Sequence, residues 1–255
     1  MGVAVPPGPR PRFDGPERGQ GLDPHISKRL GWAWVFVACA ASTACHQRDE
    51  PRTSIPYHDD FEREQLGEAW YPSGGQWRIE DGKLFSPGGN NAPLFLRAVL
   101  PDDVVVAFDV TVGRKVDAKV ELMTNGLAHQ SGYIFIMGGW DNTLSVVARL
   151  DEHGADRVEK KPTQAAAHQT YRWRIEKQGG ALRWFVDGEL YMTFDDPNPL
   201  SGPGHDRFAF SNWQSDLEFD NLSIWPLEQA PPRQPRASAS TDPESPGEPG
   251  SSASR

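Results

Sequence analysis

The sequence predicts an all-β fold in which two antiparallel sheets pack face to face as a sandwich. Apolar and polar residues alternate, most clearly where Tyr171, Trp173 and Ile175 are separated by charged residues. This period of two is typical of strands with one buried face. Gly-Gly and Asp-Gly pairs between such stretches favour hairpin turns. No segment carries the apolar stripe of a long helix, so about a dozen short strands indicate a sandwich.

The strands follow from this pattern in chain order. Gly179-Gly180 and Asp187-Gly188 separate three alternating stretches and therefore predict two successive hairpins. Elsewhere, apolar runs bounded by turn residues predict single strands. Residues 164–169 are expected to form at most one helical turn. The predicted strands are 77–79, 84–85, 94–99, 104–112, 119–123, 133–137, 144–150, 171–175, 182–186, 190–194, 207–210 and 217–224.

Composition and charge exclude several classes of protein. The chain has 255 residues, with 26 Lys and Arg against 35 Asp and Glu, and a formal net charge of −9. This balance argues against a nucleic-acid partner, because duplex binding depends on cations that neutralise phosphates. Two cysteines are too few for a disulfide scaffold or a cysteine-rich zinc module. Nine Trp and twelve Phe suffice for one core, which we place in residues 57–228 and expect to be monomeric.

The N-terminal region predicts export. Lys28 and Arg29 precede the uncharged run LGWAWVFVACAA, and small residues then lead to Cys45. This order is typical of a secretory signal peptide, and the run is shorter than the roughly 20 residues that span a bilayer. The residues before Cys45 resemble the bacterial lipobox, although Ser42 stands where that motif usually has Leu. We expect 1–44 to be an N-terminal extension plus signal peptide and Cys45 to be lipidated; ordinary cleavage or a short buried helix is the alternative.

Two polar segments flank the predicted domain. Residues 45–56 contain two prolines and are expected to form a lipid-anchored tether. No Val, Ile, Leu, Met or aromatic residue follows Leu227, so residues 229–255 cannot bury enough apolar surface to order themselves. We therefore predict a disordered tail, and a domain at 57–228 that folds without it and without a divalent ion.

Four motifs occur in a characteristic order: DDFER at 59–63, GQWRIEDGKL at 75–84, YRWRIEKQGGALRWFVDGEL at 171–190 and FDNLSIWPL at 219–227. This pattern resembles the concanavalin A-like lectin/glucanase (laminin G-like) jelly roll. It is more closely similar to exported bacterial lipoproteins with a 3-keto-disaccharide hydrolase-like domain. The resemblance implies a jelly-roll arrangement of the sandwich and a function connected with saccharides. It carries over no catalytic residues.

The sequence does not support two familiar kinds of active site. Retaining glucanases on this fold place two Glu on one strand as E-x-D-x-x-E. Here Glu218 and Asp220 are followed by Ser223 in place of the second Glu, so this catalytic pair is not expected. No His spacing suggests a catalytic zinc ion. Glu121 and Glu159 are further acids whose spatial partners the sequence does not define.

Two clusters combine tryptophan with short polar side chains. One is GGWDN at 138–142, and the other is SNWQ at 211–214, after a predicted strand. An indole offers a flat apolar face to sugar C–H groups, while amides and carboxylates fix the hydroxyls. The GPGHD loop adds a histidine and an acid on a backbone that glycine lets bend. The predicted ligand-binding residues are Trp140, Asp141, Asn142, His205, Asp206, Asn212 and Trp213; the alternative places both tryptophans in the core, where Trp77, Trp173 and Trp184 are also expected.

Three aspartates raise the question of a structural cation. Asp59, Asp60 and Asp220 lie near the predicted first and last strands, and carboxylate oxygens suit Ca²⁺. Capping and Asx turns are the alternative roles. No other cofactor is expected.

Three functions remain open on the sequence alone. The first is a non-catalytic carbohydrate- or surface-binding module of an exported bacterial lipoprotein at the cell envelope. The second is a hydrolase or lyase that acts on a modified saccharide of the 3-keto-glycoside type. The third is a structural envelope or adhesion protein without a small ligand. A pocket that gathers the predicted residues would favour the first two, and a flat surface the third.

Overall fold

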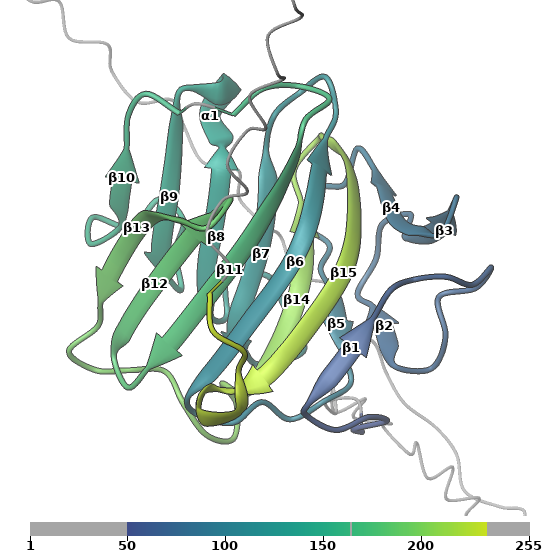
Figure 1. Ribbon diagram of the computed structural model, residues 1–255. Helices are drawn as coiled ribbons and strands as arrows, with labels where there is room; N and C mark the ends of the chain where they lie inside the picture. Colours follow the sequence, from purple (N-terminus) through teal and green to yellow (C-terminus); the bar gives the residue numbers. More distant parts are fainter. Residues whose placement is uncertain (1–49, 164, 234–255) are drawn as a thin grey trace, which may run out of the picture. The chain divides into compact units, whose positions relative to one another are not determined.

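The computed structural model describes residues 50–163 and 165–233. In these residues fifteen strands form one eight-stranded and one seven-stranded antiparallel sheet, which pack as a jelly-roll sandwich (Figure 1). The predicted fold class is therefore confirmed. The predicted extension and signal peptide, Cys45 and most of the predicted tail lie outside the described residues.

The eight-stranded sheet contains the first and the last strand of the described chain. Its strand order is β13-β12-β11-β6-β15-β4-β3, and β1 pairs with β15 beside β4. Its strands are β1 (Tyr57–Asp59), β3 (Arg78–Glu80), β4 (Lys83–Pro87), β6 (Val104–Val112), β11 (Thr170–Gln178), β12 (Ala181–Val186), β13 (Glu189–Asp195) and β15 (Asp216–Pro226).

The seven-stranded sheet has the order β10-β9-β8-β7-β14-β5-β2. A short turn, α1 (Gly139–Asn142), joins two of its strands. Its strands are β2 (Trp70–Pro72), β5 (Leu94–Leu96), β7 (Ala118–Thr124), β8 (Tyr133–Gly138), β9 (Leu144–Arg149), β10 (Val158–Lys160) and β14 (Arg207–Asn212).

Aromatic side chains fill the core between the sheets. Trp173 and Trp184 are fully buried, and their ring centroids lie 4.3 Å apart. Phe210 from one sheet meets Phe219 from the other at 4.2 Å. Burying each such side chain contributes about 2–3 kcal/mol. Trp77, also expected in the core, is half-buried at its margin, where its Nε1 donates to a backbone carbonyl at 3.0 Å.

The seven-stranded sheet is also buried on its outer face. Along β7, Val120 and Leu122 point into the main core, whereas Lys119 and Glu121 point outward, yet both charged residues are buried. Outward residues of β8 and β9 form a second apolar cluster: Ile134, Ile136, Leu144, Val146 and Ala148. Loops that fold over this face account for the burial, and they create the site described below.

Differences from the predicted strands concentrate in short elements. Strands β1, β2 and β10 have three residues each and were not predicted, because three positions are too few to show an alternation of apolar and polar residues. The helical turn expected at 164–169 is absent from residues 165–169. Instead, the chain makes α1 and a 3₁₀ turn, η1 (Leu227–Gln229), near the end of β15.

The chain on both sides of the predicted domain also packs against it. The N–H groups of Arg52 and Thr53 donate to the carbonyl of Arg97 at 2.7 and 3.1 Å. Beyond η1, the Arg233 guanidinium lies 4.4 Å from the centroid of the Phe185 ring. Parts of the predicted tether and tail therefore belong to the folded unit, because hydrogen bonds and a cation–π contact replace the missing apolar side chains.

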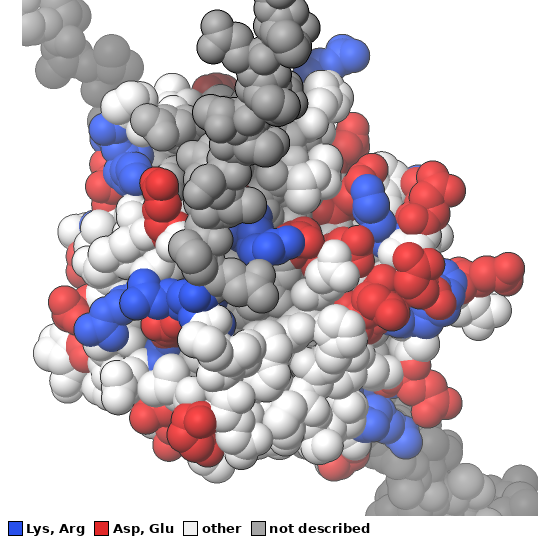
Figure 2. Space-filling view, viewed as in Figure 1, with Lys and Arg blue, Asp and Glu red and all other residues white. Residues whose placement is uncertain are grey.

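The outer face of the eight-stranded sheet is solvated and mixed in charge. Acidic and basic side chains lie next to each other on this face (Figure 2). Arg172 pairs with Asp109 at 3.2 Å, and Arg174 pairs with Glu176 at 2.7 Å. In the part of the chain that the structure describes, no helix has the length and apolar character to cross a membrane.

Candidate functional site

A pocket of roughly 270 Å³ opens on the outer face of the seven-stranded sheet. Its floor comes from β7 and β8, and its walls come from loops far apart in the sequence. We call it the Trp140–Trp213 pocket, after the two predicted residues that line it together. Its lining residues are Asn91, Asp117, Lys119, Gln130, Ile136, Trp140, Glu152, His153 and Trp213.

The two tryptophans have unlike surroundings. Trp213 follows β14, keeps 39 % of its surface exposed and belongs to neither apolar cluster. Trp140 is half-buried and rests on the second cluster. The guanidinium of Arg157 lies 4.8 Å from the Trp140 ring centroid, and His153 meets the same ring edge-on at 5.4 Å. Trp140 is thus a supported wall of the pocket, whereas Trp213 is an exposed ring at its margin.

An unusual backbone turn places Trp140. Trp140, Asp141 and Asn142 have φ values of 50°, 56° and 61°, so three successive residues are left-handed. Each such residue costs roughly 1–2 kcal/mol. The Asn142 side chain donates to the Ala165 carbonyl at 2.9 Å and helps to hold the turn. Only glycine suits position 138, because φ is 73° there and a Cβ would collide with the Val116 side chain. Strain of this kind is often found where a side chain must be aimed at a ligand.

The Trp213 wall is fixed by buried amide contacts. Asn212 is almost fully buried, and its Nδ2 donates to the Ser86 and Ser215 carbonyls at 3.0 and 2.7 Å. Its own carbonyl accepts from the Asn91 N–H at 2.8 Å. Asn212 therefore positions both Trp213 and Asn91 without lining the pocket itself.

A buried ion pair lies in the pocket floor. Lys119 Nζ donates to Glu152 Oε2 at 2.7 Å and to Asn91 Oδ1 at 2.9 Å. The side chains of Lys119 and Glu152 are only 2 % and 9 % exposed. Because a buried charge is costly unless it is paired, each of these two groups stabilises the other. The pocket consequently holds a fixed ammonium whose charge is already balanced.

A second acid, Glu121, lies deeper beside this pair. His129 Nδ1 is 2.7 Å from Glu121 Oε1, and the Gln130 N–H donates to Glu121 Oε2 at 3.0 Å. His129 Nε2 is 3.6 Å from Glu152 Oε2. These contacts tie the loop between β7 and β8 to the sheet and form one wall of the pocket.

Two buried polar atoms of the site lack a hydrogen-bond partner, His129 Nε2 and Asp117 Oδ1, and of these two residues only Asp117 lines the pocket. It is 5 % exposed and lines the pocket, and its Oδ1 is buried without a hydrogen-bond partner. Burial raises the pKa of Asp117 to about 6; Glu152 adds to this rise, and Lys119 opposes it. Buried acceptors are nearly always satisfied, so an unpartnered carboxyl group in the lining of a pocket indicates a place for a ligand donor.

The other predicted residues do not line this pocket. Asp141 and Asn142 are exposed on the α1 turn. His205 and Asp206 precede β14, whereas Trp213 follows it, so about 23 Å of strand separates Asp206 from Trp213. His205 Nδ1 lies 3.0 Å from the Ser131 carbonyl oxygen. The predicted single surface of residues 138–142 and 202–213 is therefore wrong for the GPGHD loop.

The three aspartates considered for Ca²⁺ all accept hydrogen bonds from nearby backbone N–H groups, and those of Asp59 and Asp60 are Asx-type contacts. Asp59 accepts from the Phe61 N–H, Asp60 from the Glu62 N–H and Asp220 from the Asn221 N–H. The Asp59 carboxylate also accepts from Arg63 and from the Trp70 indole. Among the described residues, no group of three or more His, Cys, Asp and Glu side chains is arranged to hold a metal ion.

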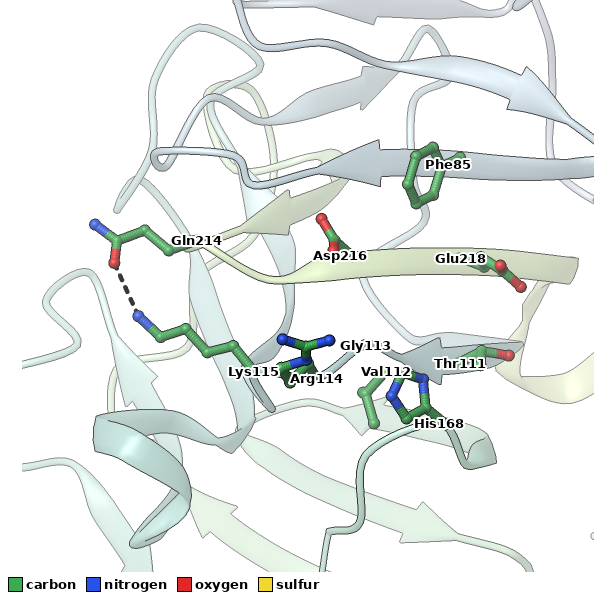
Figure 3. A pocket seen from close by; sticks show the side chains of 10 residues that line it. All are labelled: Phe85, Thr111, Val112, Gly113, Arg114, Lys115, His168, Gln214, Asp216 and Glu218. Carbon is green, nitrogen blue, oxygen red and sulfur yellow. Dashed lines mark hydrogen bonds between the residues drawn. The ribbon is translucent and has the colours of Figure 1, made fainter.

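A second hollow of roughly 500 Å³ is lined in part by Gln214, the residue that directly follows Trp213. Lys115 Nζ donates to Gln214 Oε1 at 2.8 Å at one end, and Phe85 and Glu218 lie at the other (Figure 3). Glu218 is 42 % exposed and pairs with Lys83. The hollow is larger, but its charged side chains are exposed or half-exposed, so the candidate site is the Trp140–Trp213 pocket.

Sequence reasoning found the tryptophans and missed the polar floor. Lys119 and Glu121 alternate with apolar residues, which is the pattern of an ordinary solvated strand face. Asp117, Glu152 and His129 stand in loops, where charged residues carry no signal of burial. The available signal was two opposite charges on one face of a strand as apolar as AKVELM.

No protein-family model and no curated protein matches the chain. Several solved structures are similar in fold. The carbohydrate-binding module CBM66 of Bacillus subtilis has a TM-score of 0.54 and 16% identity, covering 69% of this chain and 99% of the module. The β-glucanase of Bacillus licheniformis has a TM-score of 0.51 and 10% identity, covering 66% of this chain and 97% of the enzyme. At these identities the similarity establishes the jelly-roll fold.

Proposed function

We propose that the domain is a carbohydrate-binding module and that the Trp140–Trp213 pocket holds its ligand. One observation carries the proposal. The indoles of Trp140 and Trp213, from loops far apart in the sequence, line one pocket together with amide, ammonium and carboxylate groups. Apolar rings beside fixed donors and acceptors are what a pyranose ring requires. The similarity in fold to a module named as carbohydrate-binding supports this assignment.

The domain is proposed to act as a monomer in an exported bacterial lipoprotein at the cell envelope. The support is the basic pair, the short apolar run and the small residues before Cys45. Cys45→Ser should leave the precursor unprocessed or release the protein from membranes. Unchanged detergent partitioning together with an unchanged mature mass would refute the anchor.

A hydrolase or lyase of the 3-keto-glycoside type is the second candidate. The observation in its favour is that Asp117 and Glu152 meet in one pocket, with Glu121 and His129 beside them. Glu152 is already paired with Lys119, however, which leaves one free carboxyl in place of a catalytic pair. Turnover of any bound saccharide that is lost in Asp117→Asn would favour the enzyme. The existence of the pocket argues against the purely structural role.

The test of the binding function is a glycan array followed by titration calorimetry on the saccharides that bind. Trp213→Ala and Trp140→Ala should each abolish binding, because each removes an aromatic ring that lines the pocket. Trp225→Ala is the matched control, since this half-buried tryptophan lies on the outer face of the other sheet. Absence of binding to every array saccharide, or equal loss in the control, would refute the proposal.

A further inference from the structure

The charge that the pocket leaves unbalanced belongs to Asp117. Oδ1 of its carboxyl group is buried and unpartnered in the pocket wall. The ammonium of Lys119 is committed to Glu152 and Asn91 at 2.7 and 2.9 Å, so it is not free to bind an anion. A ligand that enters the pocket therefore meets a carboxyl group that accepts no hydrogen bond from the described residues.

The other charged groups around Asp117 do not cancel this acceptor. Lys115 and Lys119, on its own segment, draw its pKa down, whereas Glu152 from the β9–β10 loop and Asp141 from the α1 turn push it up. Lys115 is half-exposed and bonded to Gln214. His153 also lines the pocket, but its side chain is 62 % exposed.

We propose that the pocket selects saccharides that carry no carboxylate and that donate a hydroxyl or ammonium hydrogen to the carboxyl group of Asp117. This inference rests on the carbohydrate-binding function proposed above and specifies the ligand class for the same site. An ionised carboxylate is an acceptor only, so it binds O–H and N–H donors. A uronate brought beside it would add a second negative charge at a desolvated position, where like charges repel strongly.

The same contact makes binding depend on pH in a defined direction. A ligand donor favours the ionised form of Asp117, so affinity is greatest above the pKa of about 6 and falls as the carboxyl group takes up a proton. About one tenth of Asp117 is ionised one unit below that pKa, so affinity should fall about tenfold between roughly pH 7.5 and pH 5.

The experiment compares three probe classes on the full-length protein: neutral cello-oligosaccharides, chitosan oligomers and oligogalacturonates. We expect probes of the first two classes to bind and oligogalacturonates to bind at least about tenfold more weakly. Asp117→Asn should weaken binding of the tightest probe about tenfold near neutral pH and remove the pH dependence that Asp117 causes. Asp195→Asn is the matched control, because it removes the same charge from an exposed position on β13.

The possible results separate this inference from the function on which it rests. If oligogalacturonates bind as tightly as the other probes, or if Asp117→Asn keeps the wild-type affinity and pH profile, the inference is overturned and the binding function stands. If none of the three probes binds, both are overturned for these saccharide classes. The wild-type pH profile supplies a readout that needs no variant, and a melting curve of Asp117→Asn establishes that it is folded.

Discussion

Replacing Asp117 by asparagine should stabilise the folded protein near neutral pH and have little effect in acid. Burial raises the pKa of this carboxyl group from 3.8 to about 6. The folded state therefore binds a proton more tightly than the unfolded state. Its protonation contributes stability that is fully present below pH 3.8 and is lost as the pH rises through about 6. Asparagine has no such titration.

The size of the effect follows from the shift. A change of about two pKa units corresponds to about 3 kcal/mol. About 2 kcal/mol of this change in unfolding free energy occurs between roughly pH 4 and pH 7.5. The remainder occurs below pH 4, where Asp117 of the unfolded state is still being protonated. The free energy of unfolding of Asp117→Asn, minus that of the wild type, should therefore increase by about 2 kcal/mol over this range.

Urea unfolding followed by tryptophan fluorescence measures this difference at both pH values. Subtracting the wild type cancels the titrations that the two proteins share, and Asp195→Asn controls for loss of a surface charge. A difference that stays constant within about 0.5 kcal/mol would show that the Asp117 carboxyl is not perturbed by burial.

Three further predictions concern separate parts of the domain. Trp213→Ala should abolish saccharide binding and change the unfolding free energy by less than about 1 kcal/mol, because the ring is outside both apolar clusters. A loss of about 3–5 kcal/mol in a urea titration would instead identify a core residue. Lys119→Met should destabilise the protein by about 3–5 kcal/mol in the same assay, since Glu152 would be left buried without its cation, and an unchanged unfolding curve would contradict this. Truncation after Glu228 should lower the melting temperature by roughly 1–4 °C, because it removes the cation–π contact of Arg233. Truncation after Arg233 should leave the melting temperature unchanged. Equal melting temperatures of the two truncated proteins would count against this contact.

The long strands were predictable from sequence because the alternation of apolar and polar residues shows which face of each strand is buried. Every second residue is large and apolar along β6 and from Tyr171 to Ile175 of β11, and the predicted segment 104–112 coincides with β6. The short strands were not predicted. In Trp70–Pro72, for example, apolar and polar residues do not alternate, and the segment ends in proline. Trp70 is held instead by tertiary contacts, including its indole hydrogen bond to Asp59 at 2.8 Å.

The site was only half predictable, for a related reason. Tryptophan beside amide groups after a strand is a local signal, and it directed attention to Trp140 and Trp213, which line one pocket. The burial of Lys119, Glu152 and Asp117 depends on loops that come together only in the folded chain. His205 shows the opposite case, because its glycine-rich loop looked exposed and functional but lies at the far end of β14.

The pairing of β1 with β15 makes the fold largely independent of where the chain starts. Tyr57 lies opposite Ile224, and Asp59 lies opposite Leu222, so the two ends of the sandwich are neighbours in one sheet (Figure 1). A short linker could join them, and new termini could open at the Gly202–Gly204 turn, where added side chains would meet no nearby atoms. Circular permutation of this kind is tolerated at exposed loop tips. The pocket would keep its strands and loops in such a permutant, and the chain would then enter and leave the domain at a different edge.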